Sequence, residues 1–458
     1  MASFTIDEIG RATKGKLLHK GKSNYVSGVS TDTRTIQDGD VFIALKGDNF
    51  DGHAFLTMAC EKGAACVIIS TEEAGNSLPE SVSVFLVEDT KQALEDLAHF
   101  HRMRFHVPVI GVTGSNGKTT TKDMIAALLS TRFQVCATQK NFNNEIGLSK
   151  TLLSMTEKTE VVVVEMGMRG FGQIAELCHI ASPTIGVVTN VGTSHIGILG
   201  SQANIAKAKG ELIEALPADG LAVLNGDDPY VKAMGQSFSG KVITYGMKEH
   251  STVMAKDIHY EETMTRYTCA MFDEAYKIKL NVLGPHNVYD ALAATAVARI
   301  LGVDYRKIQK ALSDFQPIGQ RQTILDVHGI SIMDDSYNAN PLSMEMAFRS
   351  LKQLPGNHYY LVLGDMGELG AFEEELHYET GKKAAAIGFD GLITVGPLCN
   401  HLAKGAREGG MTTVIETASC EEAARELSKL AKPGDMVLVK GSHYMHMEKI
   451  PGLLGSGD

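Results

Sequence analysis

The stretch "VTGSNGKTTTK", Val112–Lys122, decides how this sequence folds. Gly117, Lys118 and Thr119 match the second glycine, the lysine and the hydroxyl of the phosphate-binding pattern G-x-x-x-x-G-K-[ST], whereas Val112 replaces the first glycine. The apolar run "VPVIGVT" precedes the glycines, and "TTKDMIAALLS" follows them with the spacing of a helix. The stretch therefore predicts a strand, a glycine turn and a helix in the order that phosphate binding requires.

A glycine turn that opens a helix suits phosphate, because its backbone N–H groups surround the oxygens and the helix N-terminus adds partial positive charge. In such a loop Lys118 reaches the β- and γ-phosphates, and the hydroxyl of Thr119 binds Mg2+. The alternative is a plain glycine-rich turn beside a lysine, but the flanking strand and helix favour ATP. The predicted ATP-binding loop comprises Thr113, Gly114, Ser115, Asn116, Gly117, Lys118 and Thr119.

Length and charge narrow the class of protein. A chain of 458 residues is too long for one core and predicts about three domains. Its 43 basic and 54 acidic residues give a net charge of -11 without a basic stripe, so we expect no nucleic-acid partner. The sequence has no leader-like apolar start and no apolar stretch long enough to span a membrane, which predicts a cytoplasmic protein without membrane insertion. We also expect a monomer.

The seven cysteines form no C-x-x-C pair and no cysteine–histidine spacing suited to zinc. Most of them lie within apolar segments such as "GAACVIIS" and "FQVCATQ". We therefore predict buried, reduced thiols without a chemical role.

Short Val/Ile/Leu runs alternate with helical patterns along nearly the whole chain, which predicts an α/β fold. The predicted domains are a small N-terminal α/β domain (1–106), a central P-loop ATPase-like domain with a mostly parallel sheet (107–318), and a C-terminal Rossmann-like domain (319–458). Between residues 251 and 280 the apolar residues alternate, as in "TMTRYTCAMF", which indicates antiparallel strands beside the parallel sheet.

Two polar clusters follow predicted strands of the central domain. Glu165 ends "VVVVE", and Asn190 and His195 follow "TIGVV" in "TNVGTSHIG". Ligands of open α/β sheets gather at such strand ends, where Glu165 is suited to Mg2+. Taken alone, Glu165 is equally well explained as a solvated acid at a strand end, whereas a lone histidine such as His195 is more often a structural residue than a ligand.

The helix "SQANIAKAKGELIEAL" carries Lys207 and Lys209, which by themselves indicate a solvated face. Two residues apart on a helix, these lysines point in different directions. The residues themselves do not select one of them.

Taken in order, the motifs resemble those of the Mur ligase family. They are "TGSNGKTT", "EMG", "TNVGTSHIG", "AKAKGEL", "GPHNVYDALAA", "GQRQ", "DDSYNANP", "GDMGELG" and "KGSHYMHME", spread over more than three hundred residues. "DDSYNANP" and "GDMGELG", together with the absence of "DNPR", resemble the member that adds a terminal dipeptide, and Ser30–His53 resembles its uridine-nucleotide domain. The resemblance implies an ATP- and Mg2+-dependent, ADP-forming ligase of peptidoglycan synthesis. Its substrates would be UDP-N-acetylmuramoyl-tripeptide and D-alanyl-D-alanine.

Site residues follow from the same resemblance. It implies a catalytic set of Lys118, Glu165, His195, Lys209 and Arg321. Lys118 would contact the γ-phosphate; one or two Mg2+ ions would be held by Thr119, Glu165, His195 and, once carbamylated, Lys209, with Lys207 as the alternative lysine. Asn287, Arg321 and Asp335 would contact the nucleotide. Ser30, Asp32, Arg34, Asn143 and Asn144 would bind the uridine substrate.

Two positions depart from the family pattern. Asp290 stands where the family usually has Asn, and His443 where many members have Arg. We assign neither a ligand contact.

Two other functions remain open at this stage. A folylpolyglutamate synthase would share the ATP core but would not need the uridine-type first domain. A P-loop switch or ATP-driven binding protein would hydrolyse nucleotide without joining substrates. The third residue of the peptide, diaminopimelate or lysine, is also open.

Overall fold

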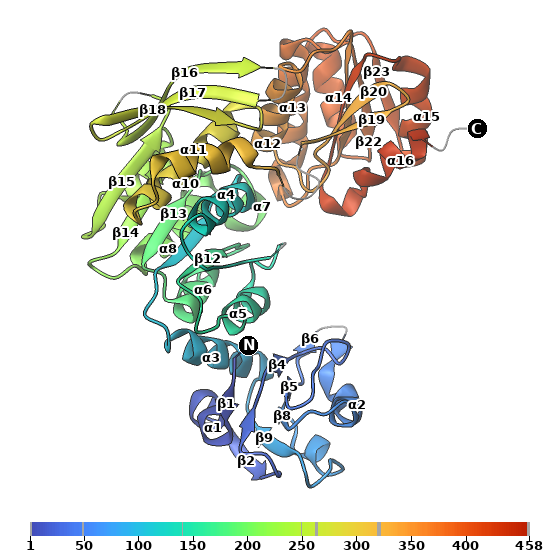
Figure 1. Cartoon of the computed structure of the whole chain (residues 1–458). Coiled ribbons are helices and arrows are strands. Elements are labelled where there is room, and N and C mark those ends of the chain that lie inside the picture. Colours follow the sequence, from blue (N-terminus) through green and yellow to red (C-terminus); the bar gives the residue numbers. More distant parts are fainter. Residues whose placement is uncertain are drawn as a thin grey trace.

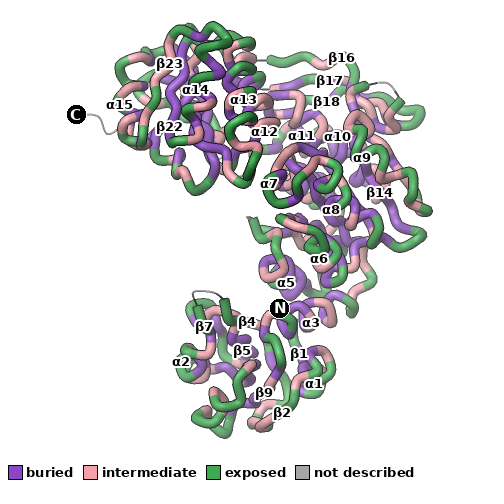
Figure 2. The backbone as a smooth tube through the Cα atoms, turned by 180° about the vertical axis from the view of Figure 1, so that it is seen from behind, coloured by how far each residue is buried: buried purple, intermediate pink, exposed green. Residues whose placement is uncertain are grey.

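The computed structural model describes residues 2–47, 50–139, 141–248, 250–261, 264–317 and 322–455. It has three α/β domains, each built on one main sheet, which follow one another in space as they do along the chain (Figure 1). Figure 2 shows buried backbone running through the interior of each domain, while exposed residues lie along its outer helices, loops and edge strands. The predicted α/β class with three domains is confirmed.

The N-terminal domain has a five-stranded sheet in the order β2-β9-β8-β5-β4, parallel except for β2. The apolar runs in "DVFIAL", "ACVIIS" and "SVFLVE" form β5, β8 and β9. The elements of this domain are β1 (Phe4–Thr5), α1 (Ile6–Thr13), β2 (Lys16–His19), β3 (Tyr25–Val26), β4 (Val29–Ser30), β5 (Val41–Ile43), β6 (Lys46–Gly47), β7 (Phe50–Asp51), α2 (Leu56–Glu61), β8 (Cys66–Ile69) and β9 (Ser83–Leu86).

Helix α3 (Thr90–Arg102) joins the N-terminal domain to the central one. Asp89 caps its start by accepting hydrogen bonds from the N–H groups of Lys91 and Gln92. Lys91 Nζ lies 3.0 Å from Glu176 Oε1 and 3.4 Å from Glu145 Oε1, both of which belong to the central domain. The same helix contributes buried apolar residues to a cluster that continues into the central domain.

The central domain has a nine-stranded sheet in the order β11-β12-β10-β13-β14-β15-β16-β17-β18. The four valines of β12 are buried, as expected for a parallel strand covered on both faces. The parallel part and its helices are β10 (Val109–Thr113), α4 (Lys118–Ser130), β11 (Val135–Ala137), α5 (Glu145–Leu153), β12 (Val161–Glu165), α6 (Gln173–Ala181), β13 (Ile185–Val188), α7 (Ile196–Leu199), α8 (Gln202–Glu214), β14 (Leu221–Asn225), α9 (Pro229–Met234) and β15 (Lys241–Gly246).

The antiparallel strands predicted for residues 251–280 are confirmed. Strands β16 (Val253–Glu261), β17 (Met264–Met271) and β18 (Glu274–Leu280) pair antiparallel at one edge of the sheet. Every second side chain along β17 is buried and the ones between are partly or fully exposed, which explains the alternation seen in the sequence. Helices α10 (Pro285–Ile300) and α11 (Tyr305–Asp314) then return to the central domain.

The C-terminal domain has a six-stranded sheet in the order β19-β20-β24-β21-β22-β23, parallel except for β19. The apolar runs in "ISIMDD", "HYYLVLGD", "GLITVG" and "DMVLVKG" form β20, β21, β22 and β24. The elements are β19 (Thr323–Val327), β20 (Ile330–Asp334), α12 (Pro341–Leu351), β21 (Tyr359–Gly364), α13 (Glu373–Ile387), β22 (Gly391–Val395), α14 (Cys399–Glu408), β23 (Val414–Thr417), α15 (Cys420–Leu430), β24 (Met436–Lys440) and α16 (Ile450–Gly455).

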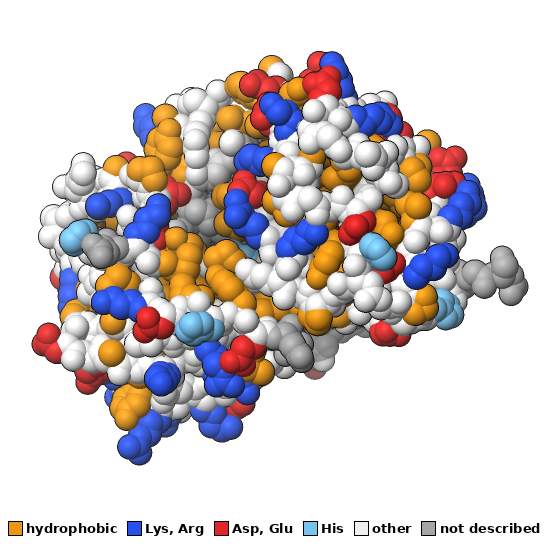
Figure 3. All heavy atoms as spheres, turned by 90° about the horizontal axis from the view of Figure 1, so that it is seen from above, with side chains coloured by type: hydrophobic (Ala, Val, Ile, Leu, Met, Phe, Trp, Pro, Cys, Tyr) orange, Lys and Arg blue, Asp and Glu red, His pale blue; other side chains and the backbone are white. Residues whose placement is uncertain are grey.

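In the part of the chain that the structure describes, neither the cysteines nor the charged surface residues indicate a further site. All seven cysteines are free, five of them buried, as predicted. On the face seen in Figure 3, basic and acidic side chains are interspersed rather than gathered by sign. Within the described residues, no helix combines the length and the apolar character needed to cross a bilayer.

Candidate active site

A cleft of about 1700 Å³ lies where strands of the central sheet end, and the C-terminal domain forms its other wall. Most predicted site residues line it: Ser115, Asn116, Gly117, Lys118, Thr119, Asn143, Asn144, Glu165, His195, Asn287 and Asp335. Thr113, Gly114 and Lys209 are buried residues outside this lining, and Ser30, Asp32 and Arg34 lie in the N-terminal domain. Arg321 lies outside the described residues.

The predicted strand, turn and helix form around two glycines that no other residue could replace without strain. Gly114 has a φ of 153°, and a Cβ there would lie 1.8 Å from Thr189 Oγ1. Gly117 has a φ of 79°, and a Cβ there would lie 2.5 Å from Asp290 Oδ1. Val112 is a buried residue of β10 and lies before the turn, which explains why the first glycine of the general pattern is not needed.

Lys118 is the first residue of α4, so its charge lies at the positive end of a 13-residue helix. Its Nζ donates a 2.9 Å hydrogen bond to the carbonyl of Gly114. The ammonium thus lies over the loop whose backbone N–H groups are suited to phosphate.

Glu165 ends β12 and is 1% exposed. Its Oε2 accepts a 2.7 Å hydrogen bond from Thr119 Oγ1, and its Oε1 accepts a 2.8 Å bond from Asn143 Nδ2. A buried carboxylate beside a hydroxyl in a cleft offers the oxygen ligands that Mg2+ prefers. The neighbouring Asn144 also lines the cleft, and its side chain caps α5 by accepting from Gly147 N at 3.0 Å.

His195 lies at the start of α7, and its Nδ1 is 2.6 Å from Glu368 Oε2 in the C-terminal domain. Arg169 Nε is 3.3 Å from the other oxygen of that carboxylate. The hydrogen bond from His195 and the charges of His195 and Arg169 lower the pKa of Glu368 against the opposing effect of burial. The motif "GDMGELG" contains Glu368, but the sequence does not point to this acid as a site residue, since its partners come from another domain.

The two lysines of α8 differ in their surroundings. Lys207 is exposed, with Nζ 5.8 Å from the ring centroid of Phe171, whereas Lys209 is 2% exposed. Burial, together with the nearby charge of Lys118, lowers the pKa of Lys209 well below its ordinary value. Among the described residues no carboxylate pairs with Lys209 within 4.0 Å. A neutral amine is the form that reacts with CO2, so Lys209 has the environment that carbamylation needs.

Asn287 lines the cleft at the start of α10. Its Nδ2 donates to the carbonyl of Leu283 at 2.6 Å and lies 3.1 Å from His286 Nε2. Asp290, one turn along α10, accepts a 2.8 Å hydrogen bond from Thr121 Oγ1 of α4. The acid that departs from the family pattern therefore joins α10 to the phosphate-loop helix.

Asp335 follows β20 and forms an ion pair with Lys440 at the end of β24, with 2.6 Å between Oδ2 and Nζ. Lys440 is 2% exposed and also donates to the carbonyl of Asn338 at 2.9 Å. Lys440 is a cleft residue that the sequence did not single out, although it ends an apolar strand run as Glu165 does.

The predicted uridine-side residues form one turn of the N-terminal domain. Arg34 Nη2 donates to Asp32 Oδ2 at 2.7 Å, and Ser30 Oγ donates to the carbonyl of Asp32 at 3.0 Å. Hydrogen bonds from Arg34 lower the pKa of Asp32 to about 2, and Lys150, which lines the cleft, adds a smaller effect.

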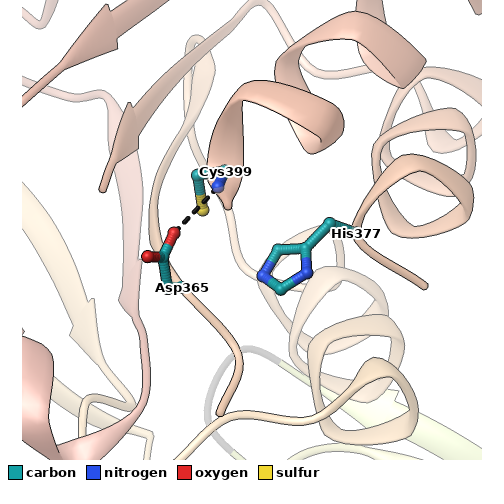
Figure 4. Close-up of side chains that lie close together, drawn as sticks. All are labelled: Asp365, His377 and Cys399. Atoms are coloured by element: carbon teal, nitrogen blue, oxygen red, sulfur yellow. Dashed lines mark hydrogen bonds between the residues drawn. The ribbon is translucent and has the colours of Figure 1, made fainter. Parts of the chain in front are cut away.

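Asp365, His377 and Cys399 form a buried cluster in the C-terminal domain that could be mistaken for a metal site (Figure 4). His377 Nε2 accepts from Met366 N at 2.9 Å, and its Nδ1 lies 2.6 Å from the carbonyl of Glu373. Asp365 Oδ1 accepts from Cys399 N at 2.8 Å, and burial raises the pKa of the Cys399 thiol well above its ordinary value. Both ring nitrogens of His377 therefore have partners within the protein, and the Cys399 thiol keeps its proton. The contacts of this cluster join strands to helices, which is a structural role.

Three family models match successive parts of the chain. Residues 25–102 match "Mur ligase family, catalytic domain", residues 112–298 match "Mur ligase middle domain", and residues 320–443 match "Mur ligase, glutamate ligase domain".

Relatives match over nearly the full length. The chain is 38% identical to the UDP-N-acetylmuramoyl-tripeptide–D-alanyl-D-alanine ligase of Bacillus subtilis over 98% of both chains. A crystal structure of MurF from Acinetobacter baumannii is similar over 100% of both chains, with a TM-score of 0.92 at 29% identity. MurF from Thermotoga maritima in complex with ADP covers 94% of this chain and 97% of its own, with a TM-score of 0.84 at 30% identity. The chain therefore belongs to the Mur ligase family and, within it, to the MurF branch.

Proposed function

We propose that the chain uses ATP to join D-alanyl-D-alanine to UDP-N-acetylmuramoyl-tripeptide in peptidoglycan precursor synthesis, with release of ADP and phosphate. The observation that carries this proposal is the single cleft in which the phosphate loop, the Glu165–Thr119 pair and the Asp335–Lys440 pair face one another. Such a site can hold a nucleotide and an acceptor carboxylate together while the C-terminal domain covers them.

The reaction proceeds by two displacements. An oxygen of the tripeptide carboxylate attacks the γ-phosphorus of ATP, and the bond from that phosphorus to the bridging oxygen breaks, so ADP leaves and an acyl phosphate remains. The amine of D-alanyl-D-alanine then attacks the acyl carbon and loses a proton, the C–N bond forms, and the C–O bond to phosphate breaks. Lys118, at the start of α4, neutralises charge that develops on the γ-phosphate. Arg321, outside the described residues, is proposed for the same purpose.

Mg2+ fits this cleft, because a carboxylate, a hydroxyl and an imidazole are available from Glu165, Thr119 and His195. Bound there, one or two ions would neutralise phosphate charge. Lys209 is proposed as a carbamate, since its burial and lowered pKa favour the neutral amine from which a carbamate forms. Lys207 is the weaker candidate because it is exposed.

We also propose the remaining assignments made from the sequence. Asn287 and Asp335 contact the nucleotide, and Asn143 and Asn144 contact the substrate near Glu165. The domain limits near His106 and Ile318 are supported by the limits of the three family matches, although Ile318 lies outside the described residues. We propose a cytoplasmic monomer without a nucleic-acid partner.

Substrate omission tests the function. Phosphate release would be measured with ATP, UDP-N-acetylmuramoyl-tripeptide and D-alanyl-D-alanine, each left out in turn, and the product would be identified by mass. We expect release to depend on all three and to match the amide formed one to one. Steady release without the dipeptide, or with no amide product, would instead support an ATP-driven binding protein.

Asp32 and Arg34 provide a separate prediction for the N-terminal domain. We expect Asp32→Ala and Arg34→Ala each to raise the KM for the uridine substrate roughly tenfold, the effect of losing one charge-assisted contact. The KM for ATP should stay nearly constant, since the turn lies in another domain. Steady-state kinetics with each substrate varied would measure both constants.

Arg11→Ala is the matched control, because Arg11 is an exposed arginine of the same domain on α1. It should leave both KM values unchanged. A parallel rise in the KM for ATP in the Asp32 and Arg34 variants would contradict the assignment of this turn to uridine binding.

A further inference from the structure

We propose, on the basis of the function proposed above, that Asn116 and Asn340 form an amide latch that holds the C-terminal domain closed over the phosphate loop. Asn116 belongs to the loop itself, and Asn340 belongs to "DDSYNANP" in the C-terminal domain. Neither side chain takes part in the displacements described above, so both are positioning residues.

The latch consists of two reciprocal hydrogen bonds. Asn340 Nδ2 donates to Asn116 Oδ1 at 2.7 Å, and Asn116 Nδ2 donates to Asn340 Oδ1 at 3.3 Å. Each amide therefore uses its donor and its acceptor on the other. Asn340 is 7% exposed, so a partner lost from this pair would not be fully replaced by water.

On the loop side, the central domain alone sets the backbone of Asn116. Its N–H donates to Asn190 Oδ1 at 3.0 Å, and its carbonyl accepts from Asn190 Nδ2 at 3.0 Å and from Thr189 Oγ1. The side chain is the part of Asn116 that reaches the C-terminal domain. The loop can therefore keep its form without the latch.

On the other side, Asn340 is built into a rigid element. It is the N-cap of α12, and its Oδ1 also accepts from Ser343 N at 2.9 Å. The same segment supplies Asp335 and Asn338, which both contact Lys440 on the cleft wall. Movement of Asn340 away from the loop would therefore move this wall with it.

A second contact between the two domains lies at α7. Gly197 N donates to the carbonyl of Glu368 at 3.2 Å, and a Cβ on Gly370 would lie 2.7 Å from Gly197 Cα. Val191, Ala339 and Leu369 belong to one buried apolar cluster. Because these contacts persist without the amides, loss of the latch should shift the balance between closed and open forms without unfolding either domain.

Serine and aspartate variants test the latch, because both residues cap helices well, so α12 is preserved at Asn340. Asn340→Ser and Asn116→Ser shorten the side chains and break the pair. We expect each to lower kcat roughly tenfold, and the double variant to be no slower than the slower single one, because the pair is already lost. The double variant Asn116→Asp, Asn340→Asp should instead lower kcat by more than the product of the two single effects, since two carboxylates would then face each other.

Closure itself would be measured by small-angle X-ray scattering with a non-hydrolysable ATP analogue and the uridine substrate. The parent should become more compact, and the serine variants should respond less. Asn400→Ser, at an exposed position on α14, is the control and should match the parent in rate and scattering.

The latch would be overturned if the two single effects on kcat simply multiplied in both double variants. It would also be overturned if variants with a lowered kcat became as compact as the parent in the scattering measurement. Circular dichroism would verify folding, and Asn340→Asp, which keeps one acceptor for Asn116, provides a milder second variant. If the parent made no amide, the proposed function would fail, whereas the scattering comparison would still decide the latch.

Discussion

Lys118→Ala should reduce ligation by about a thousandfold, because it removes the cation placed at the start of α4 against the charge of the transferring phosphoryl group. The fold should survive, since the glycine turn is set by its own backbone and neighbours, and the Lys118 side chain donates to carbonyls of the loop itself, such as Gly114 O. Initial rates of phosphate release at saturating substrates, with circular dichroism on the same sample, would measure this.

Lys158→Ala is the matched control for that variant. Lys158 is an exposed lysine in a turn of the same domain, so its loss should leave the rate unchanged. Near-parental activity in a folded Lys118→Ala variant would mean that this loop is not the catalytic ATP site.

Lys209→Ala should be nearly inactive, with partial recovery on adding formate or acetate. The expectation follows from charge: beside Glu165 and His195, a bound metal would repel an ammonium and attract a carbamate. A short carboxylate can enter the space left by the truncated side chain and supply the missing negative charge. Rates measured against increasing formate, with chloride at equal ionic strength as the reference salt, would reveal the recovery.

Lys207→Ala provides the comparison on the same helix. Lys207 is exposed over Phe171, so its loss should cost little, and formate should not change its rate. Recovery for Lys207→Ala but not for Lys209→Ala would identify Lys207 as the carbamylated lysine. Full activity in both variants would remove the carbamate from the mechanism.

The main strands of all three sheets were predictable because they are buried apolar runs. β11, β19 and β23 were not predicted, and each lies at an edge of its sheet. Edge strands are only half covered: β19 is exposed along most of its length and β23 is largely intermediate. Their residues consequently lack the apolar run on which the prediction of parallel strands depended.

The phosphate loop could be predicted in detail because its chemistry is local in sequence. The partners of the other site residues could not be predicted from the sequence. Glu368 meets His195, and Asn340 meets Asn116, across the boundary between two domains, and no spacing in the sequence encodes that contact. Likewise, the choice between Lys207 and Lys209 depends on which face of α8 is covered, which the structure supplies through burial.

Transfer of an oxygen isotope tests the central claim, which is ligation through an acyl phosphate. UDP-N-acetylmuramoyl-tripeptide would carry ¹⁸O in the carboxyl group that becomes the amide, and the released phosphate would be analysed by mass spectrometry. Because the attacking carboxylate oxygen leaves with phosphorus, we expect each phosphate to carry one ¹⁸O, with one phosphate formed per amide bond. Unlabelled phosphate, formed while the substrate retains its ¹⁸O, would show that water attacks ATP directly and would contradict the account.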